Sequence, residues 1–402
     1  MDTSKMQNLQ PLDSSQMANL LVQSQTLRTI AADFFTALDF SLLRNQIVEV
    51  VENNYDLGKV TAVYEIFGGY VNRSFGIYTE KDGRRYEYFI RKYKDGIVEQ
   101  EILFEHKLIM FAIENGLSIA ANLLKTRGGK TFVKIAEGGG QGSNEHRYFA
   151  VYEYLPGEDK YTWVDNLLTD EEYASSAEML AAFHNGARNF DPAGLERVEL
   201  QIAELIPTLP AIFKEYAATD ISNRFHSYYL KNLDSILAAI KRIQFPPQDL
   251  AQMPFIPVHC DFHPGNEKFQ DGKVVGLFDF DWSKIDLRMF DIGLGLVYFC
   301  GNWIDELDGT LMLDQCEIFL KAYQQKLREL GGLAPLNEVE KKHLVTILDA
   351  GNMYLIFWCL RAYYGDTTMN EYEYQVYLTH QVKLMNWIDA HRREIAGIAE
   401  RI

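Results

Sequence analysis

Two short polar motifs in the second half of the chain constrain its fold more than any other feature. The first occupies residues 259–266 and reads HCDFHPGN, and the second, FDFD, begins at residue 278. The apolar run VVGLF at residues 274–278 predicts a buried strand that delivers Asp279 at its end. Loops at the ends of such elements carry a large share of catalytic groups. We therefore expect Asp261, Asn266 and Asp279 to meet at one hairpin.

These residue types at this spacing suit phosphoryl transfer. The reaction needs a carboxylate that accepts the proton of the attacking hydroxyl and oxygen ligands that hold Mg²⁺ on the nucleotide phosphates. Asp261 is the candidate base, and Asn266 and Asp279 are the candidate metal ligands. Asp281 is a further candidate ligand. An ordinary turn is the alternative, because His, Asp, Asn and a Pro-Gly pair are common in turns. The FDFD motif favours the chemical interpretation.

The same residues resemble the aminoglycoside phosphotransferase and choline kinase superfamily of small-molecule kinases. Protein kinases place Arg within their H-x-D, whereas this chain has Cys260 there and continues F-H-P-G-N, which looks like the H-x-D-x-H-x-x-N form of the small-molecule branch. The FDFD motif followed by Asp291, Ile292 and Gly293 is similar to that family's I-D-F-D … D-L-A stretch. No A-P-E motif or long activation segment lies between them. The resemblance covers about residues 45–300 in order.

The resemblance implies an α+β, bilobal, protein-kinase-like fold. Its small N-lobe is built on an antiparallel β-sheet, its larger C-lobe is mostly helical, and ATP binds between them. A chain of 402 residues is long enough for two such lobes. We expect an extension of unknown role over residues 1–32, the N-lobe over 33–156 and the C-lobe over 157–402. By the same resemblance, His259 holds the catalytic loop through a hydrogen bond, and Asp291 braces that loop without binding metal.

A glycine-containing turn supplies candidate phosphate contacts in the N-lobe. Period-two patterning from residue 60 onward predicts the sheet, and the sequence GGYVNRS interrupts it at residues 68–74. This turn is not G-x-G-x-x-G, but it resembles the G-G-x-x-N form of the small-molecule family. The candidates are Gly69, Asn72 and Ser74, because small residues let backbone amides approach phosphate oxygens. An ordinary hairpin remains the alternative.

The strand predicted at residues 88–93 carries two adjacent cations, Arg91 and Lys92, and strand alternation allows only one of them to face the nucleotide. The family's Y-V-L-R-x-Y pattern favours Arg91, whereas the protein-kinase register V-A-I-K favours Lys92. The helix predicted at residues 98–115 carries Glu105, eleven residues before a glycine as in the family. The resemblance makes Glu105 the ion-pair partner of that cation, and a solvated helix carboxylate is the alternative.

The adenine contact is expected at the end of the next strand. The run at residues 148–155 ends at a Pro-Gly pair and resembles the strand and hinge that connect the two lobes. Backbone groups near Glu153 and Tyr154 would then contact the adenine ring.

Composition excludes several other classes of protein. Net charge is −17 without a basic cluster, which weighs against nucleic-acid binding. No apolar run reaches the length of a membrane span, and the N-terminus lacks a basic region followed by an apolar core, so we expect a cytoplasmic protein. The 4 cysteines contain no C-x-x-C, which argues against a disulfide framework or a zinc site. The acidic balance suits a cationic substrate but is equally common as a solubility feature.

Two residues of the predicted helical lobe have competing interpretations. His184 follows a predicted capping box, TDEE at residues 169–172, and is expected to be a packed core histidine. Arg361 follows a long apolar helical run, where a charge requires a partner or a ligand. If Arg361 binds substrate, the metabolite is anionic. The alternative is an internal ion pair.

The sequence therefore predicts an enzyme that transfers the γ-phosphate of ATP, with Mg²⁺, to a hydroxyl of a small metabolite, as a monomer or a homodimer. Homoserine, amino alcohols and amino sugars fit the same scaffold, because a fold does not fix its substrate. The alternatives are a catalytically silent nucleotide-binding regulator and an aminoglycoside-modifying kinase. Protein kinase activity is disfavoured because the activation segment is missing.

Overall fold

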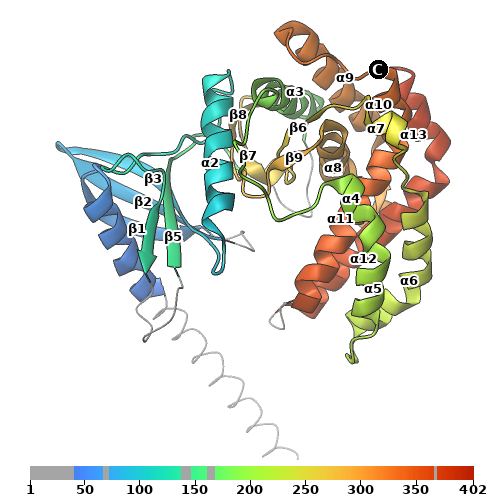
Figure 1. The fold of residues 1–402 in the computed structure, drawn as a ribbon, viewed down its shortest axis with the longest axis horizontal. Coiled ribbons are helices and arrows are strands. Elements are labelled where there is room, and N and C mark those ends of the chain that lie inside the picture. Colours follow the sequence, from blue (N-terminus) through green and yellow to red (C-terminus); the bar gives the residue numbers. More distant parts are fainter. Residues whose placement is uncertain (1–39, 67–71, 137–145, 161–167, 366–368) are drawn as a thin grey trace, which may run out of the picture. The chain divides into compact units, whose positions relative to one another are not determined.

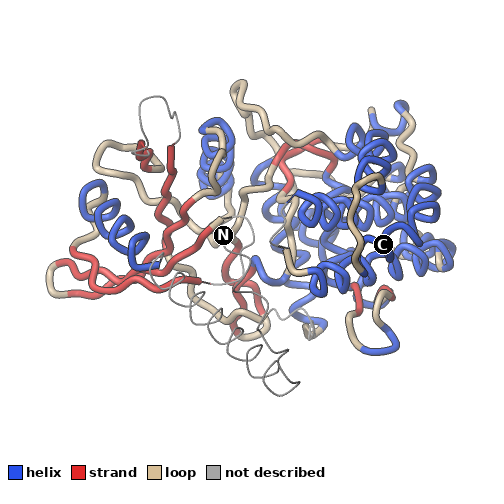
Figure 2. The backbone as a smooth tube through the Cα atoms, turned by 90° about the horizontal axis from the view of Figure 1, so that it is seen from below, coloured by secondary structure: helices blue, strands red, loops and turns tan. Residues whose placement is uncertain are grey.

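The protein forms two compact units, seen in a computed structural model that describes residues 40–66, 72–136, 146–160, 168–365 and 369–402 (Figure 1). The first unit contains the chain up to Lys94 together with Lys125–Val151. The second contains Asp95–Leu124 and Tyr152–Ile402. The combination of an antiparallel sheet with a largely helical second unit confirms the predicted α+β class (Figure 2). The proposed extension at residues 1–32 lies outside the described residues.

The first unit is built on a five-stranded sheet in the order β1-β2-β3-β5-β4. Its strands are β1 (Lys59–Ile66), β2 (Arg73–Lys81), β3 (Arg84–Lys92), β4 (Val133–Ala136) and β5 (His146–Glu153). The β2–β3 turn is Asp82-Gly83, and both residues have positive φ, as a two-residue hairpin with the natural strand twist requires. The amphipathic helical stretch at residues 40–54 packs its apolar side on the sheet, where the rings of Phe40 and Phe75 stack at 6.4 Å.

The second unit is dominated by helices, with three short antiparallel hairpins or strand pairs among them (Figure 2). Its longer helices are α2 (Glu99–Glu114), α3 (Asp170–Ala187), α5 (Leu209–Ala217), α6 (Arg224–Arg242), α8 (Arg288–Cys300), α9 (Leu313–Leu330), α11 (Leu344–Gly365), α12 (Glu371–Ala390) and α13 (Arg392–Ala399). The short helices are α4 (Ile202–Leu205), α7 (Pro247–Leu250) and α10 (Glu338–Lys342). The strand pairs are β6 (Phe255–Val258) with β9 (Lys284–Leu287), β7 (Glu267–Gln270) with β8 (Lys273–Leu277), and β10 (Gly301–Asn302) with β11 (Thr310–Leu311). The predicted capping box at the start of α3 is present.

Helices α8 and α11 form the centre of this unit. They approach closely because Gly293 and Gly351 face one another, and a Cβ atom on Gly293 would lie 2.7 Å from the Ile347 carbonyl oxygen. Among the described residues, α11 alone is long and apolar enough to cross a membrane, but 78% of its apolar window is buried inside the protein. The apolar length of α11 is therefore explained by its place in the core.

Helix α2 belongs to the second unit, which differs from the predicted N-lobe boundaries of 33–156. Phe104 and Phe111 on α2 both pack edge-on against Phe190, with ring centroids 5.5 and 5.6 Å away. The Gly186 position in α3 keeps the two helices close, since a Cβ there would lie 3.2 Å from the Asn115 carbonyl oxygen. A helix follows the surface on which it buries its apolar face, and sequence order alone did not reveal that surface.

Candidate active site

The two motifs of the sequence meet at the hairpin formed by β7 and β8. Strand β6 ends one residue before His259, so the HCDFHPGN loop connects β6 to β7. Beyond β8, the Phe278 N–H donates to the Asn266 carbonyl at 3.1 Å, which continues the strand pairing by one step. Asn266 therefore lies opposite Phe278, and Asp279 is the next residue along the chain. The structure brings the amide and the carboxylate together at one end of a hairpin.

A buried carboxylate on α8 fixes the conformation of the catalytic loop. Asp291 accepts the His259 N–H at 2.7 Å through Oδ2 and the Cys260 N–H at 2.9 Å through Oδ1. Cys260 has a φ of 62°, a left-handed conformation that costs a non-glycine residue of order 1–3 kcal/mol unless its surroundings impose it. These two hydrogen bonds impose it, and the resulting sharp turn precedes Asp261.

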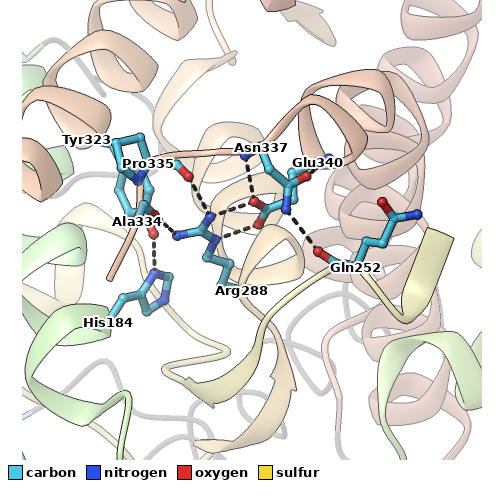
Figure 3. A network of polar contacts seen from close by, with 8 residues as sticks. All are labelled: His184, Gln252, Arg288, Tyr323, Ala334, Pro335, Asn337 and Glu340. Atoms are coloured by element: carbon cyan, nitrogen blue, oxygen red, sulfur yellow. Dashed lines mark hydrogen bonds and ion pairs between the residues drawn. The ribbon is translucent and has the colours of Figure 1, made fainter. Parts of the chain in front are cut away.

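His184 is the side-chain partner of that carboxylate. Its Nε2 lies 3.0 Å from Asp291 Oδ2. Its Nδ1 lies 2.7 Å from the Tyr323 hydroxyl, a contact drawn in Figure 3. Burial lowers the pKa of His184, so the neutral ring donates from Nε2 to Asp291 and accepts at Nδ1 from Tyr323. Burial opposes ionisation of Asp291, but hydrogen bonds from His184 and the His259 backbone hold its pKa below the ordinary range. Asp291 therefore stays ionised, and His184 is a packed histidine that positions it.

His259 connects the two motifs directly. Its Nε2 lies 3.0 Å from the Phe278 carbonyl oxygen, and burial lowers its pKa, so the neutral ring donates this hydrogen bond. The backbone of Phe278 is thus held at its N–H by Asn266 and at its carbonyl by His259. Asp279, which follows, has a φ of 67°. Non-glycine residues with such a positive φ are often found at active sites, where surrounding contacts maintain the backbone strain.

Asp261 presents a partly exposed carboxylate, with 25% of its side-chain surface accessible. Its Oδ1 accepts from the Tyr298 hydroxyl at 3.3 Å, and its Oδ2 accepts from the Asn266 side-chain amide at 3.2 Å. His263 Nε2 lies 3.7 Å from the same Oδ2, while its Nδ1 accepts the Gly265 N–H at 3.0 Å. The carboxylate is therefore oriented from several sides and still accessible.

Tyr298 and His263 were not predicted as site residues. Tyr298 lies seven residues after Asp291 in α8, two helical turns further on the same face, and this periodicity was a signal that could have identified it. Burial raises the pKa of the Tyr298 phenol, and the charge of Asp261 adds to the effect. Tyr298 is therefore a neutral hydrogen-bond donor.

The residues predicted to bind metal provide a donor set that suits Mg²⁺. Asn266 uses its amide nitrogen toward Asp261, with contacts of 2.8 Å to the backbone oxygen and 3.2 Å to the carboxylate, and this leaves its side-chain carbonyl oxygen as a ligand. Asp279 and Asp281 contribute hard carboxylate oxygens nearby in sequence. Over the described ranges, no group of three or more His, Cys, Asp or Glu side chains converges as a metal cluster. Mg²⁺ needs no such cluster, because phosphate oxygens and water complete its shell.

The phosphate candidates of the first unit come together on β2 and β3. Ser74 lies opposite Arg91 in the strand register, and Asn72 accepts the Lys94 N–H at 2.9 Å through its side chain. Arg91 is buried, whereas Lys92 is half-buried, as alternation in a strand requires. Gly69 lies outside the described residues.

Glu105, Glu153 and Tyr154 all belong to the second unit. Glu105 lies on α2, Glu153 is the last residue of β5, and Tyr154 follows it. Glu105 is buried and accepts the Tyr152 hydroxyl at 3.2 Å, so it is not a solvated helix carboxylate; its pairing with a cation stays a prediction. The Glu153 N–H donates to the Asn122 carbonyl at 2.9 Å. The side chains of Glu153 and Tyr154 are exposed. The Glu153 amide is therefore already bonded within the protein, and the adenine contact near Glu153 and Tyr154 stays a prediction.

Arg361 is not buried as its sequence context suggested. Its side chain is 52% exposed, and Nη1 lies 3.6 Å from Glu199 Oε1. The apolar run of α11 is surrounded by protein as far as Leu360, and its last turn emerges at the surface. The structure thus contains the ion pair that was the alternative to a substrate contact.

A buried carboxylic acid directly follows Asn266. Glu267 accepts from the Ser176 hydroxyl at 2.6 Å through Oε2, and in the part of the chain that the structure describes no partner lies within hydrogen-bond distance of Oε1. Burial raises the pKa of Glu267 to about 8, against the smaller effect of the Ser176 hydrogen bond. The acid is therefore protonated at neutral pH. Glu267 lies two residues before the buried Phe269, so strand alternation places both side chains on the same face of β7. This alternation could have predicted the burial of Glu267 from the sequence.

Replacing Glu267 with Gln is expected to change the pH dependence of stability. Between about pH 4.5 and about pH 8 the unfolded carboxyl ionises while the folded one does not, so wild-type stability falls by about 1.4 kcal/mol per pH unit through this group. Gln removes that dependence and still accepts from Ser176. Denaturant unfolding of both proteins should show their stability difference shifting by about 3 kcal/mol between about pH 5.5 and about pH 7.5, in favour of the variant. A difference that is independent of pH would contradict the protonated state.

Comparisons with known proteins identify the family to which the chain is similar. The family model described as "Phosphotransferase enzyme family" matches residues 63–330. Homoserine kinase from Ralstonia nicotianae is 24% identical over 319 residues, covering 77% of this chain and 84% of the relative. Homoserine kinase from Gluconacetobacter diazotrophicus is 25% identical over 297 residues, covering 74% of this chain and 79% of the relative.

Solved structures share the fold at low sequence identity. Spectinomycin phosphotransferase in complex with ADP and spectinomycin has a TM-score of 0.59 at 15% identity, covering 89% of this chain and 98% of the other. A microcompartment-associated aminopropanol kinase has a TM-score of 0.59 at 13% identity, covering 86% and 96%. Choline kinase from Cryptosporidium parvum has a TM-score of 0.53 at 16% identity, covering 84% and 91%. The resemblance predicted from the two motifs is confirmed: this chain is an enzyme that belongs to the phosphotransferase enzyme family.

Proposed function

We propose that the protein transfers the γ-phosphate of ATP to a hydroxyl group of a small metabolite. The observation that carries the proposal is the accessible Asp261 carboxylate, which Tyr298 and Asn266 hold in place on a loop fixed by Asp291. The names of similar proteins, kinases of homoserine, aminopropanol and choline, support a small-molecule acceptor.

Asp261 acts as the general base. It accepts the proton of the acceptor hydroxyl as that oxygen bonds to the γ-phosphorus and the bond between the γ-phosphorus and the bridging oxygen breaks, releasing ADP. Its two carboxylate oxygens are held by different donors, so one orientation is maintained before substrate binds. Pre-organised polar groups of this kind need no reorganisation at the moment of reaction.

The candidate nucleotide contacts are assigned in each unit by itself. Asn266 and Asp279 would hold Mg²⁺, with Asp281 as the less certain ligand, and the bound ion neutralises charge on the β- and γ-phosphates. Contacts to phosphate are assigned to Arg91 in preference to Lys92, together with Gly69, Asn72 and Ser74.

The remaining nucleotide assignments follow the same family pattern. Glu105 would hold the phosphate-binding cation, and backbone groups near Glu153 and Tyr154 would contact adenine. A catalytically silent nucleotide-binding regulator is the second candidate. The complete set of base, amide and metal ligand disfavours it, because a protein that only binds nucleotide does not need the general base.

An acceptor panel tests the function. Purified protein with Mg²⁺ and ATP is offered homoserine, amino alcohols including choline, hexosamines and aminoglycosides, with ADP formation followed and products identified by mass spectrometry. We expect at least one acceptor to give turnover in the usual kinase range of roughly 1–100 per second and a singly phosphorylated product. If the protein binds Mg²⁺-ATP but no acceptor raises ADP formation above the level without acceptor, the silent regulator is the correct assignment.

A further inference from the structure

A short segment between α3 and α4 lies along strand β9, next to the catalytic loop. We name residues 197–202 the Glu199 segment. Arg197 donates to the Asp281 carbonyl, Lys284 donates to the Leu200 carbonyl at 2.5 Å, and the Ile202 N–H donates to Asp286 at 2.8 Å. Strand β9 pairs with β6, with Lys284 opposite Val258, three residues before Asp261. The backbone after Glu199 is thus bonded to side chains of β9, and the Arg197 side chain before it is bonded to the backbone of Asp281.

The two carboxylate oxygens of Glu199 have different partners. Oε2 accepts from the Tyr354 hydroxyl at 3.0 Å, and Oε1 lies 3.6 Å from Arg361 Nη1. The side chain is only 14% exposed. Over the described parts of the chain, no donor lies within hydrogen-bond distance of Oε1. Glu199 therefore has, at a largely buried position, one carboxylate oxygen whose partner among the described residues is the long ion pair with Arg361.

Tyr354 binds this carboxylate and is affected by the charges of groups beside the base. It is buried on α11, and burial together with the charges of Glu199 and the groups at Cys260 and Tyr298 raises its pKa. Cys260 is the residue before Asp261, and Tyr298 donates its hydroxyl to Asp261 at 3.3 Å. Tyr354 therefore bonds to Glu199, and Tyr298 bonds to the base, both in the second unit.

The ion pair of Glu199 and Arg361 contributes little to the stability of the fold. At 3.6 Å the two groups do not share a hydrogen bond, and Arg361 is half exposed, so the pair contributes about 0–1 kcal/mol. The buried cation of this region, Lys284, makes its direct ion pair with Asp286 at 3.1 Å and acts on Glu199 only through its charge. Burying a carboxylate with a loosely held partner costs free energy, and a bound cation would offset that cost.

The geometry points to a substrate that carries both an ammonium and a carboxylate. We propose that Glu199 binds the ammonium group and Arg361 binds the carboxylate of the acceptor, whose hydroxyl then faces Asp261. In an α-amino acid the ammonium and the carboxylate are attached to one carbon. This short spacing suits Glu199 and Arg361, whose charged groups lie 3.6 Å apart. The planar guanidinium pairs well with a carboxylate. The acceptor class is therefore a hydroxy amino acid rather than an amino alcohol or an amino sugar, an inference that rests on the proposed function.

Three acceptors and two variants test this assignment. L-Homoserine carries both charges, 3-aminopropan-1-ol lacks the carboxylate, and 4-hydroxybutanoate lacks the ammonium. Arg361→Met should lower kcat/KM for homoserine by roughly 10–100-fold, mainly through KM, and leave that for 3-aminopropan-1-ol within about twofold. Glu199→Gln should cause a similar loss with homoserine and 3-aminopropan-1-ol but leave 4-hydroxybutanoate within about twofold, because Gln still accepts from Tyr354. The KM for ATP should not change in either variant.

A surface pair on α6 and α12 supplies the matched control. Arg242 Nε lies 3.3 Å from Asp389, and both side chains are partly exposed. Arg242→Met should leave kcat/KM for all three acceptors unchanged. Thermal unfolding of each variant checks that it is folded; if Glu199→Gln is not, Arg361→Met decides alone, because its side chain is half exposed.

The outcomes separate this inference from the proposed function. Equal losses with all acceptors, or no loss in Arg361→Met, would overturn the assignment of the two charges. Wild-type protein that phosphorylates choline or a hexosamine but none of the three test acceptors would overturn the substrate class and leave the proposed function intact. An absence of phosphorylated product with every acceptor would overturn the proposed function itself.

Discussion

Replacing Asp261 with Asn is expected to lower kcat by roughly 10²–10⁴-fold, the usual contribution of general acid–base catalysis. Asn has nearly the same shape and still accepts the Tyr298 hydroxyl, but it does not accept the proton of the substrate hydroxyl. Affinity for Mg²⁺-ATP should therefore stay nearly unchanged. Steady-state kinetics with the best acceptor and calorimetric titration with Mg²⁺-ATP measure the two quantities independently.

Asp279→Ala is the matched comparison for this prediction, because it alters the proposed metal ligand and leaves the base in place. It should weaken the Mg²⁺-dependent component of nucleotide binding, since one of few protein ligands to the ion is lost. Turnover of Asp261→Asn within a factor of a few of wild type would remove Asp261 from the mechanism. Unchanged Mg²⁺-ATP affinity in Asp279→Ala would remove Asp279 from the metal site.

The meeting of Asp261, Asn266 and Asp279 could be predicted because it depends on local structure. All three residues lie within one hairpin and the loop that precedes it, so alternation and turn chemistry place them close together. The sheet of the first unit was predictable for the same reason, since the Asp82-Gly83 turn joins adjacent strands. A local pattern therefore placed these three residues on one hairpin and its preceding loop, and their chemical roles stay predictions.

Contacts between distant segments were not predictable from these patterns. His184 reaches Asp291 across 107 residues, and Tyr354 reaches Glu199 across 155 residues. Periodicity identifies which face of a helix is buried, but not which polar group that face meets. For the same reason the apolar run before Arg361 suggested burial, whereas the end of α11 brings this residue to the surface beside Glu199. The substrate-binding residues of the proposal are therefore those that sequence reasoning described least well.

The network around Arg288 leads to the second large expected effect. Arg288 is buried at the start of α8 and donates to both carboxylate oxygens of buried Glu340, each at 2.5 Å (Figure 3). It also donates to the Ala334 and Pro335 carbonyls at 2.6 and 3.1 Å. Arg288→Met should lower the free energy of unfolding by about 3–5 kcal/mol, because it leaves a buried carboxylate without its counter-charge. Denaturant unfolding of variant and wild type measures this loss.

The double variant Arg288→Met with Glu340→Met distinguishes a lost attraction from an uncompensated charge. Two buried apolar side chains of similar volume often replace a buried ion pair without loss, so most of the stability should return. About 1 kcal/mol should stay lost, since Glu340 also completes the capping box with Asn337 at the start of α10. A double variant as unstable as the single one would instead show that the pair is strongly attractive in itself. Asp291 lies one helical turn beyond Arg288 and holds the catalytic loop through two hydrogen bonds. We therefore expect Arg288→Met to weaken these hydrogen bonds and to lower kcat. The double variant should restore both.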